Sequence, residues 1–439
     1  MSDHIPARRR RRWPRVLAVL VLLVALALGG AYVYARPLLL TGTGYAAHNA
    51  CAVFEVSGRD SVDEDLPPNP LVPYLSSRID GSSVRTSVFG LLAAQRAHFH
   101  SDYYGCTITD SPIKLPEATQ VLDPHPLITA PAPPPQGAIE AAIDVAFGTD
   151  LTSDEQATLG TRAVVVVKDG QIIGERYADG FTAEMPQLGW SMAKSATNLL
   201  AGILVKEGAL DLHQSGLMGW TDERRGITVD HLLRMTSGLA WDETYDLGTP
   251  ITSMLYLADD MGRFAAGQPL AHPVGRVQQY SSGSTNIACS VFDDITGEGA
   301  NLPRRALFKP LGLTTAVWEP DASGTPVCSS YLWATPREWA SIGQFALDGG
   351  VVDGVQLLPD GWMEQSTTPN EVDQAEDAGY GSSWWLNRTP TGDLVNDRLP
   401  ADTYWMQGHD GQRVFVVPSH NMVVVRMGFS PTGPDLRMG

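Results

Sequence analysis

Ser191-Met192-Ala193-Lys194 opens an apolar segment that runs to Leu212. Apolar residues recur along this segment at helical spacing, and Lys206-Glu207-Gly208 has the basic last turn and glycine stop of a helix end. The pattern predicts a helix with Ser191 near its N-terminus, where the dipole favours negative charge. Positions i and i+3 share one helix face, so the serine hydroxyl and the lysine amine are neighbours. This geometry suits a nucleophile and its base.

The four-residue pattern is not specific by itself. Ser111-Pro112-Ile113-Lys114 matches it too, although no helical run follows. An alternative interpretation makes Ser191 only an N-cap and Lys194 a solvated side chain. The rest of the sequence therefore has to discriminate between the two.

The N-terminus predicts a membrane anchor. Residues 1–15 form a basic segment with arginines from Arg8 to Arg12, and residues 16–35 are uncharged and mostly aliphatic. Twenty such residues span ~30 Å as a helix. Because positive residues stay in the cytoplasm, we expect a single-pass protein of the cell (inner) membrane whose remainder is periplasmic or extracellular. A signal peptide cleaved near Ala25-Leu26-Ala27, giving a secreted form, is the alternative.

Composition excludes several classes of function. Beyond residue 36 the chain has 24 basic and 48 acidic residues, a net charge of -24, which opposes binding of nucleic acid or anionic lipid. His98-Phe99-His100 lacks a nearby carboxylate cluster, so no metal is expected, and the chemistry below needs no cofactor. The oligomeric state is left open.

The four cysteines fit an exported protein. Three pairings are possible, and the pairing of near neighbours, Cys51 with Cys106 and Cys289 with Cys328, is expected because it requires the least chain organisation. Four free buried thiols are the alternative.

Three regions follow the anchor. Residues 38–127 show no sustained helical period and predict a small disulfide-stapled accessory region, whose role as spacer, lid or partner surface is open. Residues 128–137 form a proline-rich linker. Residues 138–439 are expected to form the catalytic domain, with a helical insert at about residues 195–300.

Two predicted hairpins define the fold class. Ala163 to Val167 and Gln171 to Tyr177 flank Asp169-Gly170, a strong hairpin signal, and Val414 to Val417 pairs with Met422 to Met427 near the C-terminus. Strands at both ends with helical patterns between them predict an α/β (α+β) fold. Its antiparallel sheet would be built from both ends of the domain and flanked by helices.

Two further motifs carry chemistry. A serine needs a base, and a lysine amine can serve if burial keeps it neutral. Tyr280, in Tyr280-Ser281-Ser282-Gly283, could relay the proton to a leaving group. His409 lies in Gly408-His409-Asp410-Gly411, just before the C-terminal hairpin. In isolation, each is equally explained as a tyrosine or histidine of a turn.

Six blocks in one order resemble the serine β-lactamase and penicillin-binding-protein superfamily, in its class C-like esterase branch, and are most similar to the 6-aminohexanoate-oligomer (nylon oligomer) hydrolases. The resemblance covers roughly Val164 to Gly428. It implies a β-lactamase/transpeptidase-like fold, with Ser191 as acylated nucleophile, Lys194 as base and Tyr280 as relay. It also implies an oxyanion hole from the backbone N–H groups of Ser191 and Gln412. The blocks are Trp190–Ser195, Ile227–Leu239, Tyr280–Gly283, Phe308–Leu313, Tyr380–Trp385 and Gly408–Gln412.

Two departures from the family pattern bear on the substrate. The family's Tyr-x-Asn is replaced by Tyr280-Ser281-Ser282, and its Lys-Thr-Gly by His409-Asp410-Gly411. The amide and the ammonium that would hold a β-lactam are thus absent, which favours an ester or small-amide substrate. The candidate substrate-binding residues are Ser282, Tyr245, Trp384, His409, Asp410 and Gly411.

The sequence supports a membrane-anchored, outward-facing serine hydrolase, against three alternatives. One is a β-lactamase or D-alanyl-D-alanine carboxypeptidase, and another is a non-catalytic binding protein on the same fold. The third makes Gly189-Trp190-Ser191-Met192-Ala193 a nucleophile elbow with His409 as base, which needs a strand before Ser191. Residues 183–189 show no strand pattern.

Overall fold

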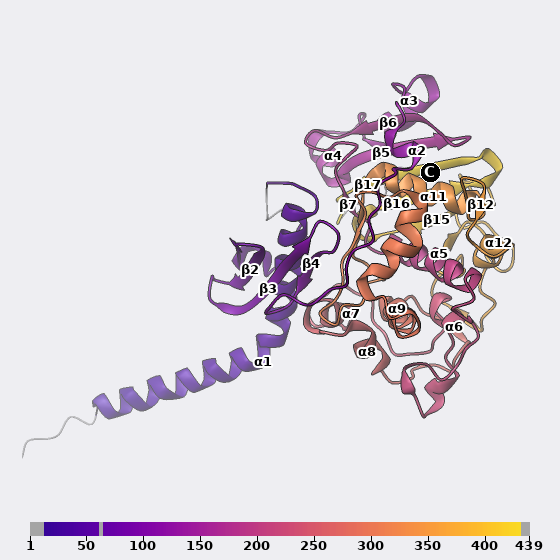
Figure 1. Cartoon of the computed structure of the whole chain (residues 1–439). Coiled ribbons are helices and arrows are strands. Elements are labelled where there is room, and N and C mark those ends of the chain that lie inside the picture. The colour runs from indigo at the N-terminus through magenta and orange to yellow at the C-terminus, as the bar shows by residue number, and fades with distance from the viewer. Residues whose placement is uncertain (1–12, 61–64, 432–439) are drawn as a thin grey trace, which may run out of the picture.

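A six-stranded sheet forms the centre of the catalytic domain in the computed structural model, which describes residues 13–60 and 65–431 (Figure 1). Its strand order is β14-β15-β16-β17-β5-β6, and every neighbouring pair is antiparallel. The middle pair, β17 with β5, joins the two ends of the domain, as the sequence predicts. The strands are β5 (Thr161–Lys168), β6 (Gln171–Tyr177), β14 (Trp385–Leu386), β15 (Tyr404–Gln407), β16 (Arg413–Val417) and β17 (Met422–Gly428).

Both predicted hairpins are confirmed. Asp169 and Gly170 join β5 to β6 with φ angles of 51° and 72°. Two successive positive φ angles are those of a type I′ turn, whose twist matches that of the flanking strands. Between β16 and β17, Asn421 supplies the left-handed residue with φ 47°.

Helices cover both faces of the sheet. Helix α3 (Gly137–Ala146) packs on β5 and β6, with Ile143 in a small buried cluster. Helix α11 (Pro336–Leu347) packs on β5, β16 and β17. A Cβ at Gly343 of α11 would lie 2.7 Å from Val423 and 2.8 Å from Val414, so the absent side chain permits this close approach.

The helical insert lies below the sheet in Figure 1. Its first helix, α5, begins directly after Ser191 and is buried at every residue from Met192 to Leu204, so it runs through the core. This burial fixes the positions of Ser191, at the helix N-cap, and of Lys194, in the first turn. The insert contains α5 (Met192–Lys206), α6 (Val229–Leu233), α7 (Pro250–Leu257), α8 (Met261–Ala266) and α9 (Ser282–Thr296).

Helix α1 (Trp13–Glu55) corrects one expectation. It continues through Pro37 and well into the accessory region, where the sequence shows no helical period. Residues 41–53 are buried almost without interruption, on all sides of the helix. A helix buried on all sides has no exposed polar face, so its sequence lacks the 3.6-residue hydrophobic period by which a surface helix is predicted. Before residue 36 the same helix projects from the body and exposes its aliphatic side chains. That part is long and apolar enough to cross a membrane.

A four-stranded antiparallel sheet, in the order β1-β2-β3-β4, completes the accessory region. Glu319 of the catalytic domain joins that domain to the accessory region. Its carboxylate accepts from the Cys106 N–H at 2.7 Å and from Trp333 Nε1 at 2.9 Å, and lies 2.9 Å from His48 Nε2. The strands are β1 (Leu75–Asp80), β2 (Ser83–Val88), β3 (Leu92–Ser101) and β4 (Gly105–Ile108).

The expected disulfides are both present. Cys51–Cys106 joins α1 to β4, and Cys289–Cys328 joins α9 to the segment before β10. The remaining elements are short. They are α2 (Pro126–Thr129), α4 (Ser153–Leu159), α10 (Lys309–Leu311), α12 (Trp362–Ser366), β7 (Gln187–Leu188), β8 (Val277–Gln278), β9 (Val317–Trp318), β10 (Leu332–Ala334), β11 (Val351–Val352), β12 (Val355–Gln356) and β13 (Gln374–Ala375).

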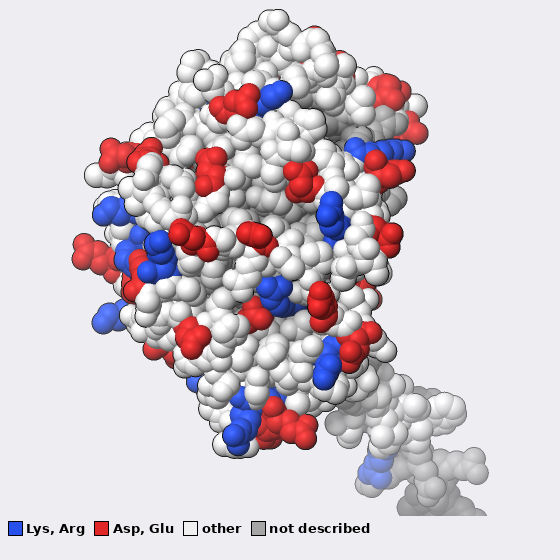
Figure 2. All heavy atoms as spheres, turned by 90° about the vertical axis from the view of Figure 1, so that its right-hand side faces the viewer, with Lys and Arg blue, Asp and Glu red and all other residues white. Residues whose placement is uncertain are grey.

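Charged side chains are scattered over the face of the catalytic domain drawn in Figure 2. Acidic and basic residues alternate there, and no broad basic patch is visible. On this face, therefore, no surface of the kind that binds a phosphate backbone is present.

Candidate active site

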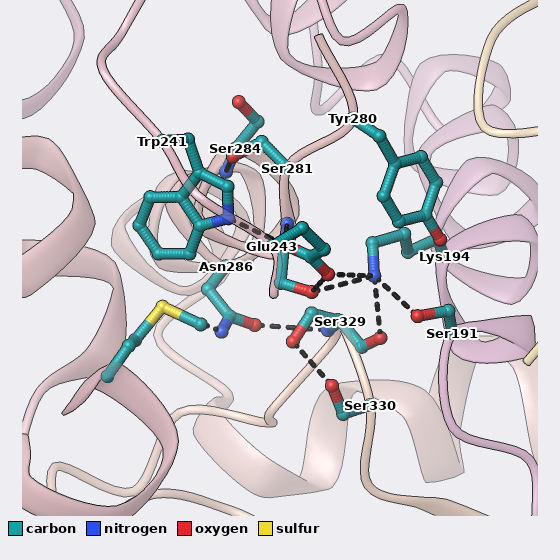
Figure 3. A network of polar contacts seen from close by, with 12 residues as sticks. Ser191, Lys194, Trp241, Glu243, Tyr280, Ser281, Ser284, Asn286, Ser329 and Ser330 are labelled. Carbon is teal, nitrogen blue, oxygen red and sulfur yellow. Dashed lines mark hydrogen bonds and ion pairs between the residues drawn. The ribbon is translucent and has the colours of Figure 1, made fainter. Parts of the chain in front are cut away.

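Ser191 lies at the N-terminus of α5, where the chain turns from β7 into the helix. The turn is made by Trp190, whose φ of 49° is unusual for a residue with a bulky side chain. The Ser191 side chain makes no capping hydrogen bond to the helix. Its Oγ instead accepts a hydrogen bond of 2.9 Å from Lys194 Nζ (Figure 3). The helix therefore presents this pair as predicted.

Lys194 is the centre of the polar network in Figure 3. Its buried Nζ also donates to Ser282 Oγ at 2.8 Å and to the Ser329 carbonyl at 3.2 Å, and lies 3.8 Å from Glu243 Oε1. Burial lowers the lysine pKa to about 8, although Glu243 acts to raise it. At pH 7 about one such amine in ten is neutral and able to accept a proton.

Tyr280 lies beside Lys194 in Figure 3, with its ring centroid 4.7 Å from Lys194 Nζ. The Ser191 side chain is close enough to the phenol to act on its pKa, which it lowers. Burial raises the Tyr280 pKa and the Glu243 carboxylate raises it further, so the phenol stays protonated at neutral pH. A neutral phenol in this position can donate one proton while it accepts another.

Glu243 is the site residue that sequence reasoning missed. Its carboxylate accepts hydrogen bonds from Ser282 Oγ, from the Ser282 N–H at 2.9 Å and from Trp241 Nε1 at 2.6 Å. A Cβ at Gly283 would lie 2.6 Å from the Trp241 ring, so the glycine of Tyr-Ser-Ser-Gly allows this packing. No local signal distinguishes Glu243 from its exposed neighbour Asp242, since only tertiary packing brings it to Lys194.

The segment from Gly408 to Gln412 lies against the start of α5. A Cβ at Gly408 would be 2.1 Å from the Gly189 carbonyl oxygen, and the Gly408 N–H donates to the Gln412 carbonyl at 2.9 Å. Within residues 65–431, neither the Ser191 nor the Gln412 backbone N–H donates a hydrogen bond. Both therefore remain available to bind a negatively charged oxygen.

Five of the six predicted substrate-binding residues divide into three groups. Ser282 belongs to the lysine network described above. Tyr245 and His409 stack on one another with ring centroids 4.3 Å apart, and both line the same cavity. Asp410 is buried and lines a different cavity, while the Gly411 carbonyl accepts from a buried arginine, Arg426, at 2.9 Å.

The prediction for Trp384 is wrong. This side chain is fully buried, its Nε1 donates to Asn198 Oδ1 at 3.1 Å, and its ring packs edge-on against Tyr404. It is a core residue with no surface for a substrate. Successive side chains point to opposite sides of an extended strand, so the next residue, Trp385, turns to the site and packs 5.6 Å from the Tyr280 ring.

A half-buried histidine and an arginine are the basic side chains at positions 409 and 413. Burial lowers the His409 pKa to about 4, so the imidazole is neutral at physiological pH. Burial also lowers the Arg413 pKa to about 10, which leaves the guanidinium charged, and its charge acts to lower the Tyr280 pKa. Arg413 donates to the carbonyls of Gly408 at 3.1 Å and Gln412 at 2.8 Å. Sequence reasoning missed this cation.

The nucleophile-elbow alternative requires a strand before Ser191 and a contact between His409 and Ser191. The structure has the strand but not the contact, within the described residues. Contrary to the sequence expectation, a two-residue strand, β7, does precede Ser191. The His409 ring, however, contacts Trp190, Tyr245 and Asp410, and no contact joins it to Ser191 in the described part of the chain. Of the two candidate bases, only Lys194 contacts the Ser191 hydroxyl among the described residues.

Acidic, histidine and cysteine side chains form no cluster of three or more that could bind a metal ion within the described residues. The side chains gathered at Ser191 are an amine, hydroxyls, a phenol and one carboxylate. This set can activate a serine hydroxyl by proton transfer alone.

Comparison with known proteins gives a consistent result. A family model described as Beta-lactamase matches residues 151–436. The 6-aminohexanoate-dimer hydrolase of Paenarthrobacter ureafaciens is 22% identical over 321 residues, which cover 63% of this chain and 74% of that protein. A solved structure from Bacillus anthracis, provisionally described as a 6-aminohexanoate-dimer hydrolase, has a TM-score of 0.59 at 23% identity and covers 72% of this chain and 86% of its own. A penicillin-binding protein homolog from Caulobacter crescentus has a TM-score of 0.53 at 16% identity, over 68% of this chain and 93% of its own. These two structures show the fold.

Proposed function

The chain belongs to the beta-lactamase family and is a serine hydrolase, and we propose that it hydrolyses an ester or small amide through an acyl-enzyme on Ser191. One observation carries the proposal. The Ser191 hydroxyl lies 2.9 Å from a buried lysine amine whose pKa is about 8, in reach of a protonated phenol. A serine hydroxyl becomes a nucleophile when a neighbouring base can accept its proton, and a lysine amine with this pKa is partly neutral at physiological pH.

In acylation, the neutral Lys194 amine accepts the Ser191 proton while Oγ attacks the substrate carbonyl carbon. The carbonyl oxygen becomes negatively charged, and the free N–H groups of Ser191 and Gln412 are the donors we assign to it. As the tetrahedral intermediate collapses, the bond to the leaving group breaks. Tyr280 passes a proton to that group and recovers one from the lysine.

Deacylation runs through the same groups. A water molecule takes the place of the departed alcohol or amine, and its proton passes to the Tyr280 and Lys194 pair as its oxygen attacks the acyl carbon. The bond from that carbon to Ser191 Oγ breaks, and the serine regains its proton. The acid product leaves and the starting state is restored.

The substrate class follows from what surrounds the serine. Ser282 occupies the position of the family's amide side chain, and its hydroxyl is engaged by Lys194 and Glu243. His409 is neutral because burial lowers its pKa to about 4. Neither side chain offers the charged contact that a β-lactam carboxylate would need. An ester or small amide without a carboxylate beside the reacting carbonyl fits these surroundings.

Arg413 supports a second candidate, a β-lactamase or D-alanyl-D-alanine carboxypeptidase. Its guanidinium lies close enough to Tyr280 for each group to influence the other's pKa. A cation in that position can attract a substrate carboxylate. Incubation with a fluorescent penicillin distinguishes the candidates, because covalent labelling that disappears in Ser191→Ala would favour the second one.

Helix α1 supports an outward-facing, membrane-anchored enzyme. From residue 16 to 28 its side chains are aliphatic and exposed, as they would be in contact with lipid acyl chains. The preceding arginines favour a cytoplasmic N-terminus. The catalytic domain would then be outside.

A substrate panel tests the proposed reaction. Nitrophenyl esters and nitroanilides of short acids would be offered to the full chain and to Ser191→Ala, with Ser111→Ala as the matched serine control. We expect hydrolysis of at least one ester by the wild type and the control, and a loss of at least a thousandfold in Ser191→Ala. Equal turnover by Ser191→Ala would refute the assignment.

A further inference from the structure

The cavity next to Tyr245 and His409 is built by two separate parts of the chain. Helix α1 and the loop leading to β1 form one wall, called the accessory wall below, and the segment after Glu243 forms the other together with His409. The residues of the accessory wall are Thr41, Gly42, Tyr45, Pro67, Asn69, Leu71, Val72 and Leu75.

The lining is apolar and carries no charge. None of its residues is acidic or basic apart from His409, whose pKa of about 4 leaves the ring neutral. The polar side chains Asn69 and Thr252 bind their own loops, through the Leu71 N–H at 2.8 Å and the Asp246 carbonyl at 2.8 Å. An aliphatic group would therefore meet chiefly carbon atoms in this cavity.

The cavity is adjacent to the catalytic groups. Tyr245 follows Glu243 by two residues, and His409 precedes the proposed oxyanion donor Gln412 by three. The ring of Trp190, next to Ser191, lies 5.9 Å from that of Tyr245 and 5.7 Å from that of His409.

Two further observations concern the two walls of the cavity. The Trp190 ring also stacks on Tyr45 of the accessory wall at 6.0 Å, so the wall reaches the residue next to the nucleophile. The Tyr245 hydroxyl is buried and has no hydrogen-bond partner among the described residues.

We propose that this cavity binds the aliphatic acyl chain of the substrate and that the accessory wall sets the preferred chain length. This inference rests on the proposed function and adds the substrate class to it. The family match begins at residue 151, so every residue of the accessory wall lies outside it. Chain-length selectivity is therefore a property of this protein's own N-terminal region.

A chain-length series of nitrophenyl esters, from acetyl to decanoyl, tests the proposal on the full-length protein. We expect kcat/KM of the wild type to rise about fourfold per added methylene until the cavity is full. Val72→Trp fills the cavity from the accessory wall. It should lower kcat/KM for esters longer than butanoyl far more than for the acetyl ester, which removes the gain with chain length. Leu91→Trp, at an exposed turn of the same region, is the matched control and should keep the wild-type profile.

Val72→Ala provides a second variant that cannot clash. Its larger cavity should move the preferred chain to a longer ester. An unchanged chain-length profile in both Val72 variants would overturn the inference, as would a parallel loss for all esters in folded Val72→Trp. Failure of the proposed function is distinct, because Ser191→Ala would then hydrolyse the acetyl ester as fast as the wild type.

Discussion

Burial and a carboxylate act on Lys194 in opposite directions. Removal from water disfavours the charged amine and lowers its pKa, whereas Glu243 at 3.8 Å favours the charge and raises it. The resulting pKa of about 8 means that the base becomes neutral as pH rises through 8. We therefore expect kcat/KM for a short ester to rise over this range.

Glu243→Gln tests this balance. Removing the carboxylate removes an influence that raises the Lys194 pKa, so the rising limb of the profile of kcat/KM against pH should move to lower pH. Asp242→Asn, at the exposed neighbouring carboxylate, should leave the limb in place. A limb that stays still or moves to higher pH in Glu243→Gln would show that the carboxylate does not act on the base as described.

Gly408→Ala tests the contact behind the oxyanion donors. The new Cβ would lie 2.1 Å from the Gly189 carbonyl oxygen, so the Gln412 segment must move away from Ser191. We expect at least a tenfold loss of kcat and a stability loss of about 1–3 kcal/mol by denaturant unfolding. Gly226→Ala is the matched control, because its Cβ would meet no atom within 4 Å. Full activity in Gly408→Ala would contradict the assigned oxyanion geometry.

At the residue scale, the sequence predicts those site residues that have a local signal. Ser191 and Lys194 share one helix turn, and Tyr280 has its own motif, so all three could be named in advance. Glu243 and Arg413 could not, because their proximity to the site arises from packing between distant segments. Trp384 was misassigned for a related reason. Composition does not reveal which of two adjacent tryptophans faces the core.

At the scale of elements, the disulfide Cys289–Cys328 supports Lys194, the proposed base. It ties α9, which begins just after Tyr280, to the residue before Ser329, whose carbonyl accepts from Lys194 Nζ. Replacing both cysteines by serine should cost about 2–4 kcal/mol of stability and lower kcat for a short ester. The same replacement at Cys51 and Cys106 is the comparison. It should cost a similar stability, measured by urea unfolding, but spare kcat. Equal effects on kcat would refute the distinction.

Elements with strong local patterns were predictable, and an element hidden by burial was not. The hairpin at Asp169-Gly170 follows from turn chemistry, and α5 from apolar spacing and its glycine stop. The extension of α1 to Glu55 was missed because this part of the helix is buried on all sides, which leaves no helical period of apolar and polar residues in the sequence. The strand β7 was missed because two residues are too few to show a period.

At the scale of the whole molecule, α1 connects the proposed anchor to the accessory wall of the cavity. Thr41 lies six residues beyond the apolar run, which is ~9 Å along the helix axis. Within the described residues, the accessory region and catalytic domain share buried contacts through Glu319. The antiparallel sheet, the helical insert and the disulfide pairing were predictable from sequence. The packing of the accessory region on the active site was not, because no motif spans the two.

Removal of residues 1–30 tests the anchor. This deletion keeps Tyr32, whose hydroxyl accepts from the Ala93 N–H at 3.1 Å. The full chain should sediment with membranes and resist extraction by salt, whereas the shortened chain should be soluble and hydrolyse a short ester within about twofold of the wild-type kcat/KM. Release of the full-length product as a soluble protein shortened near Ala27 would instead establish a cleaved signal peptide.

The most direct measurement of the central claim is covalent labelling with a fluorophosphonate, followed by peptide mass spectrometry. The account predicts one label, on Ser191, at a rate that falls by at least a hundredfold in Lys194→Ala. Lys206→Ala, at the exposed end of the same helix, should label at the wild-type rate. A label on another serine, or undiminished labelling of Lys194→Ala, would contradict it.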